Sequence, residues 1–435
     1  MMLILKKIAK DEKLLFKITL GISAIWVIAQ IALIICFWGY PHAKGDAGNY
    51  ISMAQRCFNN GQWYPMAEDV YPATWLTAQG LINLLILQLR IFGTVNFNDV
   101  LNLFLNIAIL LEIYCLGKKF FSKRTGLISV IIFCFFYSNL FIVLEPLTEL
   151  PFLFLCLSAL CLVFSGKWRY VIAAALLFAL ANWFRPLAIV FLFASAVYFF
   201  ITKVKFYNYI ALIIPYILVL FIIGTITEKK IGYFVYQSAT FGYNLLMTSH
   251  DDAKGNVNHF TFHEGGAGFI ENQDSLTFAE RDLIWRNRAY EWIEEHPVKY
   301  IALFFKKIPA LYIHDAWPFS GYWWDESVAM SFFSEKDSAA SRDIFVKKIL
   351  FQSLISIPYY LAFLLFFYAL WTNRKKLFSA KVIFLVIFIT GTIITCIFPV
   401  GMRYHYPFMF TVIIYAAWGL DSYLELEVAT ASSSF

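Results

Sequence analysis

The segment PHAKGDAGNYISMAQ, residues 41–55, sets the carboxylate of Asp46 between two glycines and four residues before Tyr50. A carboxylate in such a position can act as a general base toward an attacking hydroxyl group, or it can hold a divalent cation. A solvated turn residue is the simpler alternative, because Asp and Gly are common in turns. The surrounding sequence has to decide between these readings.

Further ionisable residues stand at the edges of apolar runs, in segments far apart along the chain. The set comprises Glu68, Asp69, Glu145, Glu149, Arg185, Arg403, Tyr404 and His405. Both glutamates of LEPLTELPF suit the start of a helix, and Arg403 suits an arginine that extends from a helix end to the membrane surface. Arg185 lies within the continuous apolar run ANWFRPLAI, where an ionisable residue indicates function by default. Arginine binds phosphate through a planar fork of donors, so the set predicts an anion site beside a carboxylate.

The composition defines the environment in which these residues act. Hydrophobic residues make up 60% of the 435-residue chain, charged residues only 15%, and the mean hydropathy is +0.66. These values are typical of a polytopic membrane protein rather than a soluble domain. The net charge of +6 comes from basic residues in short loops, which report topology rather than nucleic-acid binding. The seven cysteines have no metal-binding or disulfide spacing.

The apolar runs predict an all-α bundle of about ten transmembrane helices, since about 20 apolar residues span a bilayer. The predicted helices lie near residues 15–38, 100–117, 126–143, 147–165, 170–184, 186–202, 207–226, 347–371, 381–399 and 404–421.

Five basic clusters orient this bundle, because lysine and arginine gather on the cytoplasmic side. With residues 118–124 and 374–381 inside, the whole ionisable set falls on the outer side. This assignment requires residues 74–93 to be an amphipathic helix in the outer interface, with Gln79, Asn83 and Arg90 along one face. A genuine span is the alternative for this segment.

The same topology divides the chain into four parts. Residues 1–226 form an N-terminal transmembrane module whose first outer loop is 39–99, and residues 227–345 form a polar extracytoplasmic subdomain. That subdomain contains VKYIALFFKKIPALYI, which Lys306 and Lys307 mark as a surface helix rather than a span. Residues 346–421 hold the C-terminal spans, and residues 422–435 are expected to be a disordered tail.

Several short motifs, in this order, resemble the GT-C superfamily of membrane glycosyltransferases, and protein-mannosyltransferase-like and aminoarabinose-transferase-like bacterial members appear nearest. The resemblance covers nearly the whole chain as far as Leu420. The motifs are KGDAGNYISMAQ, YPATWLTAQGLINLLILQLRIFG, LGKKFFSKRTGLIS, NWFRPLAIV, AYEWIEEHPVKYIALFFKKI and GMRYHYPFMFTVIIYAAWGL.

The resemblance implies a polyprenyl-phosphate-linked sugar donor and an inverting transfer to a lipid, glycan or protein acceptor. It makes Asp46 the catalytic carboxylate, as general base or metal ligand, and Glu149 a second acid. Arg403 and Arg185 would hold the phosphate. The remaining candidates for substrate binding are Tyr50, Glu68, Asp69, Tyr404 and His405.

One departure from the family pattern bears on the cofactor. Many relatives carry paired acids in the first loop, whereas here Gly45 precedes Asp46 and Ala47 follows it. The resemblance therefore implies no certain cofactor, and it leaves open whether Asp46 binds a divalent cation.

The expected location is the cytoplasmic (inner) membrane, with the site facing the periplasm or exterior. Two other classes remain as alternatives, a transporter or flippase of lipid-linked glycans and a glycan ligase. No internal repeat of the kind common in transporters is evident in the sequence.

Overall fold

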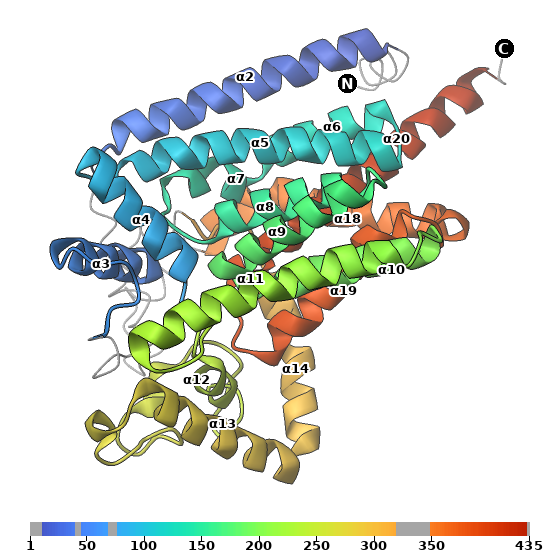
Figure 1. Ribbon diagram of the computed structural model, residues 1–435. Helices are drawn as coiled ribbons and strands as arrows, with labels where there is room; N and C mark the ends of the chain where they lie inside the picture. The colour runs from blue at the N-terminus through green and yellow to red at the C-terminus, as the bar shows by residue number, and fades with distance from the viewer. Residues whose placement is uncertain (1–10, 40–44, 68–75, 319–348, 433–435) are drawn as a thin grey trace.

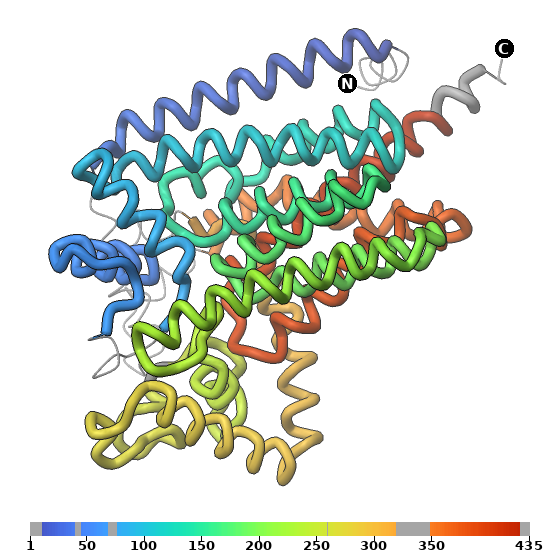
Figure 2. The backbone as a smooth tube through the Cα atoms, in the orientation of Figure 1, coloured from blue at the N-terminus to red at the C-terminus, as the bar shows by residue number. Residues whose placement is uncertain are grey.

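The computed structural model describes residues 11–39, 45–67, 76–318 and 349–432 (Figures 1 and 2). Within these ranges the chain is helical, and its β structure is one isolated bridge between Asn256 and Val400. The predicted all-α class is therefore confirmed for the described part. Glu68 and Asp69 lie outside the described residues.

The described residues of the N-terminal module form ten α-helices and one short 3-10 helix. They are α2 (Glu12–Cys36), α3 (Gly45–Asn59), α4 (Gln79–Phe92), α5 (Phe97–Phe120), α6 (Lys123–Phe135), α7 (Tyr137–Phe141), η2 (Ile142–Leu144), α8 (Glu149–Val163), α9 (Trp168–Phe184), α10 (Ala188–Ile201) and α11 (Tyr207–Ile231).

The rest of the described chain supplies a small subdomain at one end of the bundle and the last apolar helices (Figure 1). The subdomain contains α12 (Phe241–Leu246), η3 (His259–Phe262), η4 (Gln273–Ser275), α13 (Phe278–Glu295) and α14 (Pro297–Leu311). The last helices are Ile349–Ile355, α18 (Ile357–Thr372), η5 (Arg374–Lys376), α19 (Val382–Ile397), η6 (Met402–Phe408) and α20 (Met409–Ser432).

All ten segments predicted to span are helical, but they differ in length. By length and composition, α2, α5 and α11 are able to cross a membrane, and two bent pairs raise the total to five among the described residues. Five shorter apolar helices, α4, α8, α9, α10 and α19, accompany them. At about 1.5 Å per residue, the 14 residues of α4 are too short for a bilayer core, and α4 crosses one end of the bundle (Figure 1).

The turns that carry the basic clusters gather at the opposite end of the bundle (Figure 1). Lys119, in the last turn of α5, donates a hydrogen bond to the carbonyl of Phe164 just after α8. At the start of α6, Arg124 pairs with Asp421 of α20 at 3.0 Å. The Lys381 ammonium lies 4.8 Å from the centroid of the Phe121 ring. These contacts join three of the turns, and helix α20, at the end of the bundle that the charge pattern assigned to the cytoplasm.

A stripe of asparagines along α5 supports the irregular chain between α6 and α8. Asn102 donates hydrogen bonds to the carbonyls of Val143 and Glu145, at 3.2 and 2.9 Å. One turn further, Asn106 donates to the side chain of Gln30 and to the carbonyl of Asn139. Unwound backbone inside a membrane protein needs such partners. The stripe therefore fixes the bent segment that delivers α8.

This small subdomain is built on α12 and α13 and packs around Tyr243, Phe262 and Trp285. A capping box formed by Thr277 and Glu280 begins α13. Helix α14 then runs across the bundle end, where it contacts α19 and η6. Its relation to the membrane surface stays a prediction.

Lys307 behaves differently from the surface lysine that the sequence suggests. Its side chain is buried, and its ammonium donates to the carbonyls of Ile397 and Phe398 at the C-terminal end of α19. The negative end of a helix dipole favours a cation there. Burial lowers the pKa of Lys307 to about 8.

The predicted disordered tail needs a correction. Helix α20 continues as far as Ser432, so residues 422–432 are helical rather than disordered. Leu424 packs in the interior, and the leucine, glutamate and alanine residues of this segment have high helix propensity.

A close approach of α5 and α6 yields the first prediction. A Cβ atom on Gly126 would lie 2.7 Å from the carbonyl oxygen of Tyr114, whereas one on Gly21 of α2 would meet nothing within 4 Å. We expect Gly126→Leu to destabilise the protein by about 1–3 kcal/mol, as overpacking usually does. Thermal unfolding in detergent, followed by size-exclusion chromatography, measures the difference, with Gly21→Leu as the matched control. Equal melting temperatures for the two variants would contradict this packing.

Candidate functional site

The centre of the candidate site is a carboxylate held by two arginines. Glu149 begins α8, and only 1% of its side chain is exposed. The Nη1 atom of Arg185 lies 2.6 Å from Glu149 Oε1, and the Nε atom of Arg403 lies 3.7 Å from the same oxygen. The second carboxylate oxygen accepts a hydrogen bond from the hydroxyl of Thr148. The buried charge is thus compensated on both of its oxygens.

Asp46 lies on the open side of this group. Its Oδ2 atom is in direct contact with Nη2 of Arg403, and 44% of its side chain is exposed. The residue stands in the first turn of α3, where the helix dipole favours a carboxylate. Gly45 has a φ of +64°, a conformation that glycine adopts without strain. This glycine therefore allows the chain to enter α3 with Asp46 beside Arg403.

Two tyrosines complete the cluster. The ring centroid of Tyr404 lies 5.5 Å from the guanidinium carbon of Arg185 and 5.4 Å from that of Arg403. Tyr50 interacts electrostatically with Asp46 and Arg403, and burial and the negative charge of Asp46 raise its pKa. Its phenol therefore keeps its proton at neutral pH.

The local sequence explains how the arginines reach this point. Helix α9 ends at Phe184, because Pro186 disfavours helical backbone at the preceding residue. Arg185 is accordingly extended, with φ −145° and ψ 139°, and its side chain turns toward α8. Gly401 is likewise extended before η6, and this conformation delivers Arg403.

Glu145 is a further acidic residue near Arg403, but its carboxyl group is uncharged at neutral pH. Burial raises its pKa to about 8, against the opposing effect of Arg403. Its carboxyl is therefore protonated at pH 7. For Arg403, burial lowers the pKa but the surrounding acidic groups, Glu149 first among them, raise it further, so it stays charged. The negative charges of two carboxylates then balance the positive charges of two guanidinium groups. The carboxylate of Glu149 is buried, and that of Asp46 is open to solvent.

His405 lies close in sequence but belongs to a different cluster. Its side chain is fully buried, and Nδ1 lies 2.8 Å from the carbonyl oxygen of Leu311, to which it donates. Its Nε2 atom lies 3.9 Å from Oδ1 of Asp315, whose other oxygen accepts from the backbone N–H of Ser138. The backbone N–H of Asp315 donates to Ser356. This buried cluster joins α7, η6 and the start of α18.

The sequence gives no sign that Asp315 has a structural role. It stands in YIHDAWP, next to the polar loop, where an aspartate is expected to be exposed to solvent. A structure was needed to place it against His405. Because η6 carries both His405 and Arg403, this cluster helps to position the arginine.

The donor set around Asp46 does not fit a divalent cation within the described ranges. No group of three or more His, Cys, Asp or Glu side chains gathers there. The guanidinium group of Arg403 stands beside Asp46, and Glu149 is already engaged by both Arg403 and Arg185. The acids of the first loop, Glu68 and Asp69, fall outside the residues that the structure describes.

Comparison with known proteins gives structural neighbours only. No family model matches the chain, and no curated protein matches it. It is similar to the archaeal oligosaccharyltransferase AglB from Archaeoglobus fulgidus, solved with an inhibitory peptide and a dolichol-phosphate. The TM-score is 0.48 at 13% identity, over 96% of this chain and 51% of that one.

A second solved structure is the Archaeoglobus fulgidus oligosaccharyltransferase in complex with Zn and sulfate. The TM-score is 0.44 at 13% identity, over 94% of this chain and 50% of that one. The chain thus spans about half the length of the solved structures that it matches.

Proposed function

We propose that the protein transfers a sugar from a polyprenyl-phosphate donor to an acceptor hydroxyl at the outer face of the membrane. The observation that carries this proposal is the group formed by buried Glu149, two arginines and half-exposed Asp46. These residues come from α3, α8, the end of α9 and η6. A fixed cationic pair beside an open carboxylate suits a phosphate leaving group and a hydroxyl nucleophile.

The arginines are the phosphate-binding groups in this proposal. Glu149 offsets part of their charge and holds them in place, so they need no reorganisation when an anion arrives. Arg403 contacts Asp46 on the open side. A donor phosphate would compete with Asp46 for this guanidinium. Its binding would release the Asp46 carboxylate.

The released carboxylate then serves as general base. The acceptor oxygen forms a bond to the anomeric carbon while Asp46 takes the hydroxyl proton. The bond between that carbon and the phosphate oxygen breaks, and its electron pair stays on the phosphate, where Arg403 offsets the charge. A single displacement of this kind inverts the configuration at the sugar carbon.

Glu149 has a supporting role in this scheme. With 1% of its side chain exposed and both oxygens engaged, it is poorly placed to take a proton from an acceptor. We therefore assign it to positioning Arg185 and Arg403, and we assign the proton transfer to Asp46.

Replacement of Asp46 tests this function. We expect Asp46→Asn to lower the transfer rate by about 10²–10⁴-fold, the usual contribution of a general base. Binding of polyprenyl phosphate should remain, because the arginines are intact. The assay follows release of polyprenyl phosphate from lipid-linked sugars by mass spectrometry. Asp251→Asn is the matched control, since Asp251 is an exposed outer-loop residue paired with Lys299.

The outcomes separate the two roles left open for Asp46. A loss that high Mn²⁺ does not restore supports the general base. Recovery with Mn²⁺ would instead assign Asp46 to cation binding. Unchanged release of polyprenyl phosphate by Asp46→Asn would contradict the proposed function.

The pKa of Glu145 gives a second test. Below about pH 8 its carboxyl is neutral, and above that pH it adds a negative charge near Arg403. We therefore expect the affinity for polyprenyl phosphate to fall as pH rises through about 8, by up to about tenfold. Glu145→Gln should flatten this part of the binding curve in a pH titration in detergent. A slope that persists in the variant would show that another group titrates there.

A further inference from the structure

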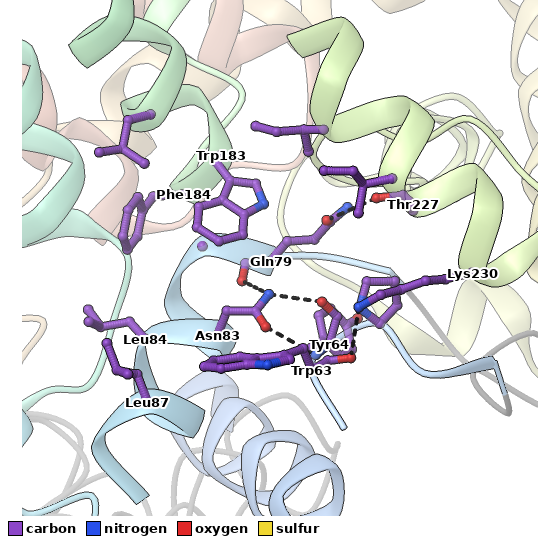
Figure 3. Close-up of a pocket in the computed structure, with 15 residues that line it drawn as sticks. Trp63, Tyr64, Gln79, Asn83, Leu84, Leu87, Trp183, Phe184, Thr227 and Lys230 are labelled. Atoms are coloured by element: carbon purple, nitrogen blue, oxygen red, sulfur yellow. Dashed lines mark hydrogen bonds between the residues drawn. The ribbon is translucent and has the colours of Figure 1, made fainter. Parts of the chain in front are cut away.

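A cavity lies between α4, α9 and α11 (Figure 3). Its volume is about 440 Å³, within the range of small-ligand sites. We call it the α4–α9–α11 cleft. Its walls come from these three helices and from the Trp63–Pro65 segment that follows α3.

The side-chain amides in the walls of the cleft are hydrogen-bonded within the protein. Asn83 donates to the carbonyls of Tyr64 and Gln79 and accepts from the backbone N–H of Tyr64 (Figure 3). The Gln79 side chain donates to the carbonyl of Val235 and accepts from Thr227. The inner surface that remains is mainly carbon, so it suits an apolar chain rather than a sugar.

The rim of the cleft consists of exposed apolar side chains. Leu87 of α4 is 42% exposed, Leu180 of α9 is 38% exposed and Ile226 of α11 is 53% exposed. Helix α11 is also one of the candidate spans, and little of its surface is buried inside the protein. In a bilayer this face meets lipid, so the cleft opens toward acyl chains.

A cation stands at the outer end of the cleft. Lys230 lies in the last turn of α11, and its ammonium donates to the carbonyl of Trp63 at 3.3 Å (Figure 3). An ammonium has three N–H donors, so two remain for an anion as far as the described residues are concerned. The Trp63 ring is held by Arg90, whose guanidinium carbon lies 4.3 Å from the ring centroid. The indole N–H of Trp183, also in the lining, is covered and has no hydrogen-bond acceptor among the described residues.

We propose that the α4–α9–α11 cleft binds an anionic phospholipid of the outer leaflet, with one acyl chain inside and its phosphate on Lys230. The apolar walls match the chain, and the ammonium at the end of a spanning helix matches the phosphate in charge and depth. Phospholipid is also the bulk component that an opening toward the bilayer meets. The inference does not depend on the proposed transfer reaction.

The cleft is separate from the group formed by Glu149, the two arginines and Asp46, although both lie next to the end of α9. Phe184 lines the cleft, and the next residue, Arg185, pairs with Glu149. A lipid in the cleft would pack against α4 and against the turn that carries Arg185. Its expected effect is therefore to stabilise that end of the bundle.

Native mass spectrometry of the full chain, titrated with dioleoyl-phosphatidylglycerol, tests the proposal. We expect Lys230→Gln to reduce the bound lipid at least fivefold, and Lys229→Gln to change it less than twofold. The two lysines are neighbours on α11, but Lys229 does not line the cleft. Ile226→Trp, which fills the cleft, should reduce binding similarly. Ile222→Trp, one turn away and 47% exposed, is its control.

Three results decide the matter. Loss of phosphatidylglycerol in Lys230→Gln and Ile226→Trp, with both controls bound, supports the site. Equal binding in all four variants overturns it. Displacement of phosphatidylglycerol by an equal concentration of polyprenyl phosphate also overturns it, because the cleft would then prefer the carrier lipid. Asp46→Asn should leave lipid binding unchanged, so a failure here is distinct from a failure of the transfer reaction.

Discussion

The burial of Glu149 at the start of α8 is the constraint on which the rest of the site depends. A carboxylate removed from water must be paired, and loss of a partner from a buried ion pair costs about 3–5 kcal/mol. Arg185 and Arg403 supply the compensation from two distant segments. The end of α9 and the start of η6 are thereby tied to α8. Asp46 meets this arrangement on its open side.

The surrounding backbone is shaped to bring these charges together. Pro186 ends α9 before Arg185, Gly45 allows the entry into α3, and asparagines of α5 satisfy the unwound chain before α8. Each of these residues ends a helix, begins a helix or hydrogen-bonds the chain between two helices, and all of them lie at the same end of the bundle. Helix breaks in a membrane protein are expected where they line a functional cavity.

Much of this arrangement was accessible from the sequence. Charge asymmetry between loops predicted that Asp46, Glu149, Arg185 and Arg403 share one side, and the ion pairs bring these four together. His405 was grouped with them by proximity in sequence, but a 3-10 helix turns it toward Asp315 instead. Hydropathy does not report the direction of a side chain in such a segment. The sequence does not predict the burial of Lys307 either, because the hydrogen-bond partners of its ammonium are carbonyl groups about 90 residues away along the chain.

In the proposed reaction, Arg403 exchanges Asp46 for the donor phosphate. An experimental structure of the protein with bound polyprenyl phosphate is the decisive measurement. We expect the phosphate to lie within hydrogen-bond reach of Arg403, Arg185 to remain in contact with Glu149, and Asp46 to have left the guanidinium. A phosphate bound elsewhere, with the contact between Asp46 and Arg403 intact, would contradict it.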